Sequence, residues 1–192
     1  MNYKDYIKKI KVEAAVLNQK ERVAIILICC IRLSPLYSRF SEVENWGNES
    51  LLTQCRELAI DWLNSKRVNS NTLSKQVGEV IPDTEDFGTV LGSYALNAGV
   101  VHEYLLDQIK NNDSSFLIYV LLSCYDTVDL YVQECLDLDR KGVTLESEIE
   151  NHPAMISEIY WQLGIFNSVK GTKDLVKLIQ GQDIEPIFKQ AA

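Results

Sequence analysis

Apolar residues recur along most of this chain at the three- and four-residue spacing of an amphipathic helix. The stripe is clearest between residues 51 and 63, where it consists of Leu51, Leu52, Cys55, Leu58, Ala59, Trp62 and Leu63. Such a stripe is typical of a helix that packs one face against a core. Alternation of apolar and polar residues is scarce, and no hairpin dipeptide joins two apolar runs. The pattern therefore predicts an all-α fold.

The length of 192 residues corresponds to about one domain. We expect residues 1–192 to form a single compact bundle of seven or eight helices with a buried central helix pair. The segments with helical periodicity are residues 3–17, 19–40, 49–66, 73–80, 83–110 and 114–138, followed by helices that start near residues 144, 153 and 172.

Local signals refine these helices. Asn18 followed by Glu21 has the spacing of a capping box, and Asp113 is expected to cap the helix that follows it. Pro35 is expected to kink or split the second helix. Asp83 or Thr84 should begin the long fifth helix. Its small residues Gly88, Gly92, Ala95 and Gly99 indicate close approach of a neighbouring backbone, since helical glycine costs about 1 kcal/mol against alanine.

The cysteines and the hydropathy bear on the compartment. The five cysteines are an odd number without a C-x-x-C pair, so we expect buried, reduced thiols and a reducing cytoplasm. The N-terminal sequence MNYKDYIKKIKVE lacks the apolar core of a secretion signal. The longest apolar run, Val23 to Ile31, is shorter than the ~20 residues of a membrane span. These features predict a cytoplasmic protein that does not associate with membranes.

No motif for catalysis stands out. The two histidines, His102 and His152, belong to no zinc-binding spacing, so no metal site is expected. The adjacent Cys29 and Cys30 have no base beside them in sequence, and the segment GTVLG is predicted to be helical rather than a phosphate-binding loop. We therefore expect no cofactor and no enzymatic activity.

The charge is unevenly distributed along the chain. The net charge is −8, which argues against direct binding of nucleic acid. Residues 1–40 carry eight Lys or Arg and three Asp or Glu, whereas residues 81–160 carry three and fifteen. The first segment therefore has a net charge of +5 and the second of −12. A concentrated negative field favours association with a basic protein partner.

Six acidic residues are the candidate partner-binding residues. Asp83, Glu85 and Asp86 stand together at the expected start of the fifth helix, where the helix dipole also explains them. Asp126, Asp129 and Asp137 share one face of the sixth helix with Gln133. This face is either a solvated helix end or a surface for a cationic partner.

Several short segments together resemble one bacterial family. These are Cys30, Arg32, Pro35, Tyr37 and Phe40 in CIRLSPLYSRF, Trp62, the turn IPDTEDF, Ala95, Asn97 and Ala98, and the set Asn151, Pro153, Ala154, Glu158 and Trp161. Their order is similar to that of the YjaG-like family of uncharacterised helical bacterial proteins (domain of unknown function 416). This resemblance implies an all-helical fold and assigns no catalytic residue. Ile31 and Asn97 replace acidic residues that are usual in the family.

We therefore expect a cytoplasmic immunity protein that neutralises a cognate antibacterial toxin domain, such as a tRNA-cleaving RNase, through its acidic surface. This step rests on analogy with other small acidic helical proteins. The alternative is a housekeeping adaptor or regulatory protein of the same family without a toxin partner. A ligand carrier or enzyme is a third possibility, in which His102 and Glu103 or the residues Tyr119, Tyr125 and Tyr131 would line a pocket. The sequence does not settle the oligomeric state.

Overall fold

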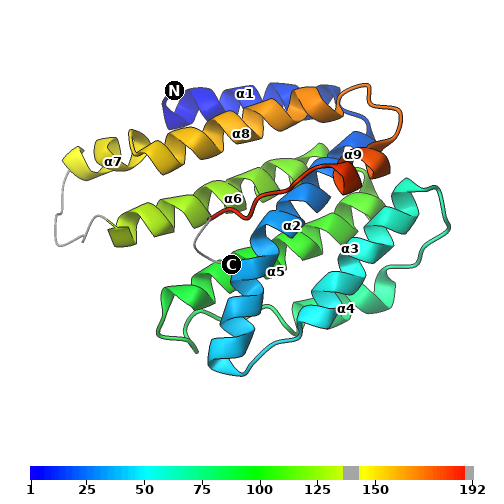
Figure 1. Cartoon of the computed structure of the whole chain (residues 1–192), viewed down its shortest axis with the longest axis horizontal. Helices are drawn as coiled ribbons and strands as arrows, with labels where there is room; N and C mark the ends of the chain where they lie inside the picture. The colour runs from blue at the N-terminus through cyan, green and yellow to red at the C-terminus, as the bar shows by residue number, and fades with distance from the viewer. Residues whose placement is uncertain (136–142, 189–192) are drawn as a thin grey trace.

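The computed structural model describes residues 1–135 and 143–188 (Figure 1). Within these ranges it contains nine α-helices and no strand, which confirms the predicted all-α class. The helices are α1 (Tyr3–Val16), α2 (Gln19–Glu44), α3 (Glu49–Leu63), α4 (Asn71–Gly78), α5 (Val90–Asn111), α6 (Ser114–Cys135), α7 (Val143–Glu150), α8 (Pro153–Val169) and α9 (Leu175–Gly181). The number exceeds the expected total of seven or eight but equals the number of segments with helical periodicity, of which α4, α7 and α9 form helices of only seven or eight residues.

Helices α2 and α5 form the central pair and have the most extensive interhelical contact of the fold. Helix α6 packs against both of them, and α3 contacts both from another side. Helices α1 and α8 lie side by side along one edge, where both contact α6 (Figure 1). Residues 182–188 follow α9 as an irregular strap that crosses the molecule beside α2 and α6.

Helix α2 suits its central position because its N-terminus is capped and the residues that follow are apolar. Asn18 and Glu21 form the predicted capping box, with Asn18 Oδ1 accepting from the Glu21 N–H at 3.0 Å. The residues from Val23 to Cys30 are all buried. Pro35 does not split the helix, which continues to Glu44. The carbonyl of Arg32, three residues before the proline, accepts the N–H of Ile187 from the strap at 3.1 Å.

The long fifth helix begins later than predicted. Helix α5 starts at Val90 with Thr89 as its N-cap, not at Asp83 or Thr84. The preceding segment forms turns because Phe87 packs edge-on against Phe40 and Trp46, at ring-centroid distances of 4.8 and 5.5 Å. This aromatic contact holds the chain away from the axis of α5, and the tertiary contact overrides the helical periodicity.

The expected close approach at the small residues occurs at Gly99. A Cβ atom there would lie 2.9 Å from Ile81 Cγ1, so the segment before α5 crosses the helix in direct contact with it. Gly88 lies outside the helix and has nothing within 4 Å. The neighbour that needs this space is therefore a turn rather than another helix.

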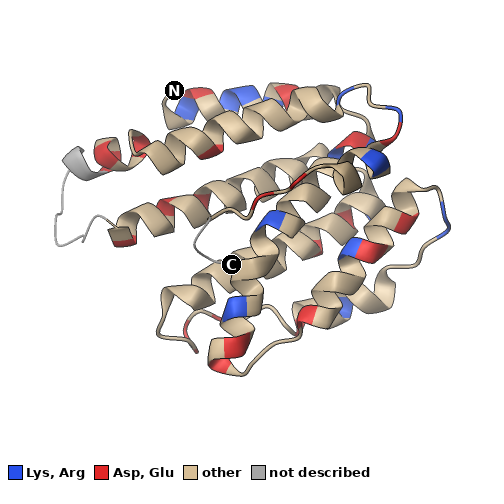
Figure 2. Ribbon diagram, viewed as in Figure 1, with Lys and Arg blue, Asp and Glu red and all other residues tan. Residues whose placement is uncertain are grey.

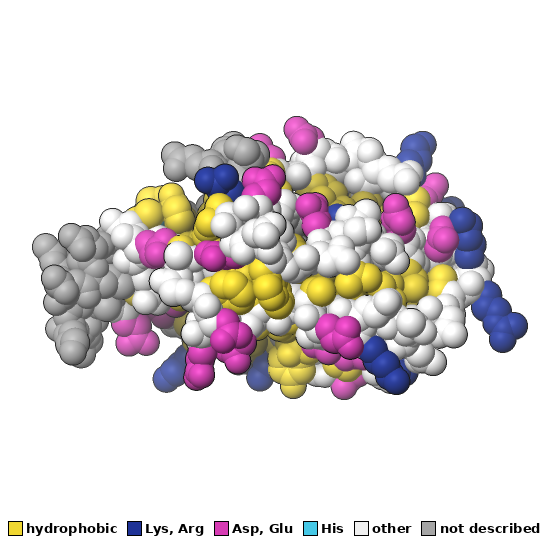
Figure 3. All heavy atoms as spheres, turned by 90° about the horizontal axis from the view of Figure 1, so that it is seen from below, with side chains coloured by type: hydrophobic (Ala, Val, Ile, Leu, Met, Phe, Trp, Pro, Cys, Tyr) yellow, Lys and Arg dark blue, Asp and Glu magenta, His cyan; other side chains and the backbone are white. Residues whose placement is uncertain are grey.

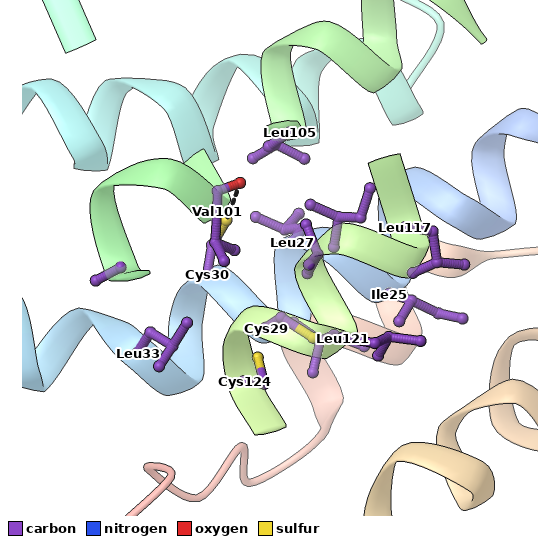
Figure 4. Close-up of a cluster of buried hydrophobic side chains, with 14 of the residues drawn as sticks. Ile25, Leu27, Cys29, Cys30, Leu33, Val101, Leu105, Leu117, Leu121 and Cys124 are labelled. Atoms are coloured by element: carbon purple, nitrogen blue, oxygen red, sulfur yellow. Dashed lines mark hydrogen bonds between the residues drawn. The ribbon is translucent and has the colours of Figure 1, made fainter. Parts of the chain in front are cut away.

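The core is built where α2, α5 and α6 meet, and it includes four of the five cysteines. Figure 4 shows Cys29 of α2 facing Cys124 of α6, with Leu121 beside them. Cys30 points the other way, with its Sγ 3.7 Å from the carbonyl oxygen of Val101. Cys29, Cys30, Cys55 and Cys124 are buried free thiols, whereas Cys135 is exposed, contrary to expectation. Burial raises the pKa of Cys30, which keeps its thiol protonated.

Two helices, α2 and α6, are long and apolar enough to span a membrane by length and composition. Within the fold, 72% of the apolar window of α2 and 44% of that of α6 are buried. Core helices of water-soluble proteins pass the same test, and the burial of α2 accounts for its apolar sequence.

Charged side chains follow the asymmetry of the sequence. Lysines gather on α1, whereas acidic residues mark α6, α7 and the ends of α2 and α3 (Figure 2). The face seen from below carries a band of hydrophobic atoms with acidic side chains on both sides (Figure 3). The lysine-rich helix α1 and the acidic helix α6 therefore lie in contact with each other.

Candidate functional site

A cleft of about 420 Å³ lies between the start of α1, the second half of α6 and α7. Its lining combines two tyrosines, four carboxylates, one amide and one aliphatic side chain: Tyr3, Tyr125, Asp126, Asp129, Gln133, Glu146, Ile149 and Glu150. We call it the acidic cleft. It contains two of the six predicted partner-binding residues.

Helix periodicity directs these carboxylates into one space. On α6, Asp126, Asp129 and Gln133 follow one face, while Val128 and Val132 are buried on another. On α7, Glu146 and Glu150 are four residues apart and therefore project from one side. Figure 2 shows acidic residues on both helices, which contact each other.

The carboxylates are only partly satisfied by hydrogen bonds. Gln133 Nε2 donates to Asp129 Oδ2 at 3.1 Å, and the Tyr3 N–H donates to Glu150 Oε1 at 3.3 Å. The other oxygen of Asp129, Oδ1, is buried without a partner among residues 1–135 and 143–188. Within the same ranges, no lysine or arginine lies within 4.0 Å of Asp126, Asp129, Glu146 or Glu150.

The electrostatics of the cleft favour an incoming positive charge. Burial raises the pKa of Asp126 above its usual range, and the neighbouring Asp129 raises it further. Burial also raises the pKa of Asp129, against the hydrogen bond from Gln133. Both shifts mean that the ionised forms lack compensating charge. A bound ammonium or guanidinium group would supply it.

Tyrosine rings form the wall of the cleft. Tyr3 lies 5.1 Å from Tyr125 between ring centroids, and Tyr125 stacks on the buried Tyr6 at 5.4 Å. Tyr3 is 39% exposed, so its ring is accessible from solvent. Aromatic faces beside carboxylates attract lysine and arginine side chains through cation–π contacts.

Three of the other four predicted residues lie elsewhere. Asp83, Glu85 and Asp86 are exposed in the turns before α5, and none of them lines the acidic cleft. Their assignment to a helix start is wrong, because Asp83 Oδ1 accepts from the Glu85 N–H at 3.0 Å in a turn. Asp137 lies outside the described residues. Of the predicted residues that the structure describes, the acidic cleft thus contains Asp126 and Asp129.

Sequence reasoning missed Tyr3, Glu146 and Glu150. The spacing of Glu146 and Glu150 indicated an acidic helix face, but nothing in the sequence indicated that this face would meet that of α6. Tyr3 is about 120 residues from Asp126 along the chain. Its position depends on the packing of α1 against α6.

The alternative site at His102 is a structural element of the core. His102 is fully buried, its Nδ1–H donates to the Ala98 carbonyl at 2.7 Å, and Arg56 Nη1 donates to its Nε2 at 3.0 Å. Because arginine can only donate and a carbonyl can only accept, the neutral ring carries its hydrogen on Nδ1 and accepts at Nε2. Burial, together with the charge of Arg56, lowers the pKa of His102 to about 3. In the described part of the chain, no cluster of three or more His, Cys, Asp or Glu could hold a metal ion.

Residues 9–182 match the family described as "Protein of unknown function (DUF416)". The chain belongs to this family. Its fold is similar to the crystal structure of a DUF416 family protein from Shewanella baltica OS155, with a TM-score of 0.78 and 22% identity over 96% of this chain and 93% of that one. No curated protein matches the sequence. The match confirms the predicted resemblance to this family.

The segments that carried the DUF416 resemblance meet inside the fold. Arg32 of α2 forms a bidentate ion pair with Glu158 of α8, with its Nη1 and Nη2 at 3.0 and 2.8 Å from the two carboxylate oxygens. The guanidinium lies 3.5 Å from the ring centroid of Trp161. Gln162 Nε2 donates to Glu158 at 2.8 Å, and Tyr6 donates its hydroxyl hydrogen to Gln162 at 2.5 Å. This network joins α1, α2 and α8.

Proposed function

We propose that this DUF416 protein is a cytoplasmic immunity protein that has no catalytic activity of its own. It binds a cognate antibacterial toxin domain, most simply a basic nuclease, and blocks the active site of that domain. The observation that carries the proposal is the acidic cleft, which four carboxylates and two tyrosines line without a basic partner among the described residues.

The chemistry of a nuclease makes it a suitable partner. An enzyme that cleaves RNA presents lysines and arginines to the phosphates of its substrate. A protein that places carboxylates against these side chains competes with the nucleic acid for the same charges. In the cleft, Asp129 Oδ1 has no hydrogen-bond donor, and Tyr3 and Tyr125 offer aromatic faces. A lysine or arginine of the partner would donate a hydrogen bond to Asp129 Oδ1 and place its positive charge beside these rings.

The alternative is an adaptor or regulatory role without a toxin partner. It uses the same cleft for a basic segment of another cytoplasmic protein. The two functions differ in the neighbouring gene, since a toxin must be encoded with its immunity protein if the cell is to survive.

Co-expression tests the proposal. The open reading frame next to the gene is expressed alone and together with this chain, and growth and co-purification are scored. We expect the neighbour to be toxic alone, harmless with the wild type, and toxic again with the Asp126→Lys/Asp129→Lys variant. The Asp83→Lys/Glu85→Lys variant is the matched control and should protect. A neighbour that is harmless alone and does not bind would overturn the immunity function.

A further inference from the structure

A second and larger pocket lies on another part of the molecule. It is a groove of about 880 Å³ along α2, closed by the starts of α3 and α5, the end of α6 and Phe188 of the strap. We call it the α2 groove. Its floor is apolar and is formed by Ile31, Pro35, Leu36, Val90 and Leu91. The volume is typical of a site for a small molecule.

One end of the α2 groove is aromatic. Phe188 stacks on Tyr131 with ring centroids 4.5 Å apart and lies 5.6 Å from Tyr94. Phe188 is held there by the strap, whose Ile187 N–H donates to the Arg32 carbonyl of α2. Glu134, one helical turn after Tyr131 on α6, also lines this end. Aromatic rings beside a carboxylate favour an organic cation.

The hydroxyl of Tyr94 is the feature that packing leaves unexplained. Tyr94 is 5% exposed and lines the groove, and its buried hydroxyl has no hydrogen bond of standard geometry among the described residues, while the Glu134 carboxylate lies near enough to act on it. Burial and the charge of Glu134 raise the pKa of Tyr94, so the phenol is neutral and can both donate and accept. A buried hydroxyl without a partner is unfavourable, and a bound polar group would remove this penalty.

The far end of the groove carries two more carboxylates. Glu42, near the end of α2, and Glu49, at the start of α3, line this end. Glu42 lies eleven positions after Ile31 on α2, which corresponds to about 16 Å along the helix axis. The one cation among the lining residues is Arg39, which is 61% exposed and lies 3.8 Å from Glu42 in a solvated pair. An anionic ligand would therefore meet three glutamates and one arginine.

We propose that the α2 groove binds a linear aliphatic polyamine. One terminal ammonium lies among Glu134, the Tyr94 hydroxyl and the rings of Tyr131 and Phe188. The methylene groups cover the apolar floor, the inner ammonium groups face the open side of the groove, and the other terminal ammonium reaches Glu42 and Glu49. This site is independent of the acidic cleft, since the two share no lining residue.

Isothermal titration calorimetry of the full chain with spermine, at about 150 mM salt to suppress nonspecific charge effects, tests this site. We expect saturable binding of one spermine per chain. Glu134→Gln should weaken binding about tenfold, and Tyr94→Phe should weaken it severalfold. Tyr94→Phe should leave the thermal stability of the free protein unchanged or higher, because it removes only an unsatisfied hydroxyl.

Two controls separate a built site from general attraction to an acidic protein. Glu42→Gln/Glu49→Gln should weaken spermine about tenfold but leave binding of n-pentylamine, which has one ammonium, unchanged. Asp126→Asn/Asp129→Asn, in the acidic cleft, should leave spermine binding unchanged. The proposal is overturned if spermine does not bind at millimolar concentration, or if the acidic-cleft variant loses as much affinity as Glu134→Gln.

Discussion

Single buried polar residues hold distant segments of this chain together. Arg32 and Glu158 are 6% and 3% exposed and are 126 residues apart in sequence. Their pairing satisfies two charges that would otherwise be very unfavourable in the core. Both charges carry further partners, Trp161 for the guanidinium and Gln162 for the carboxylate. The structural importance of the pair comes from this mutual compensation.

Removing one charge of the pair should therefore be costly. We expect Glu158→Gln to lower the free energy of unfolding by about 3 kcal/mol, since it leaves the Arg32 guanidinium buried without its counter-charge. Urea denaturation monitored by circular dichroism measures this change. The exposed pair Arg39–Glu42 is the matched control, and Glu42→Gln should change stability by less than about 0.5 kcal/mol. Equal effects at the two sites would contradict this account of the network.

His102 should make the protein sensitive to acid. Its folded-state pKa of about 3 lies below the value of about 6.5 for an unfolded histidine, so the unfolded chain binds the proton first. The stabilising contribution is complete above about pH 6.5 and declines as the pH falls toward 3, by at most about 1.4 kcal/mol per pH unit. His102→Gln should have a shallower loss of stability between about pH 6 and pH 4 than the wild type. Parallel pH profiles of the two proteins would show that His102 does not titrate in this way.

At the scale of the element, two of the helix starts that capping residues predict are confirmed, and a third is wrong. Asn18 and Glu21 form the capping box that their spacing predicted, and Asp113 Oδ1 accepts from the Ser115 N–H at 2.9 Å as expected of a cap. The predicted start of α5 is wrong because Phe87 packs against Phe40 and Trp46, which lie more than 40 residues away in sequence. Periodicity reports on neighbours along the chain and not on such contacts.

The glycines of α5 and α8 should respond in opposite ways to alanine. Gly99→Ala places a Cβ atom 2.9 Å from Ile81 Cγ1, so we expect a loss of about 1 kcal/mol in the free energy of unfolding. Gly164, inside α8, has nothing within 4 Å of its Cβ position. Gly164→Ala should therefore gain about 0.5–1 kcal/mol from helix propensity. Thermal melts of the two variants compare them, and a gain at Gly99 would mean that the close approach of Ile81 is absent.

At the scale of the whole molecule, sequence analysis predicted the class of the fold and two of the four carboxylates that line the acidic cleft. The face of Asp126 and Asp129 follows from helix geometry, but the position of Glu146 and Glu150 opposite it depends on the packing of α7 against α6. The same limit applies to Arg32 and Glu158, which belong to separate sequence segments and meet only in the folded core. Long-range pairing of this kind leaves no periodic signal in one sequence.

The chain has a net charge of −8, and four of its carboxylates line the acidic cleft, which is central to the proposed function. The most direct test is the association rate constant of the purified chain with the protein encoded beside its gene, measured by stopped flow at several salt concentrations. We expect Asp126→Lys/Asp129→Lys to slow association at least tenfold at low salt, with the difference shrinking as salt screens the field. Asp83→Lys/Glu85→Lys should associate at close to the wild-type rate. If the Asp126→Lys/Asp129→Lys variant associates at the wild-type rate at every salt concentration, the assignment of the acidic cleft as the partner-binding site is contradicted.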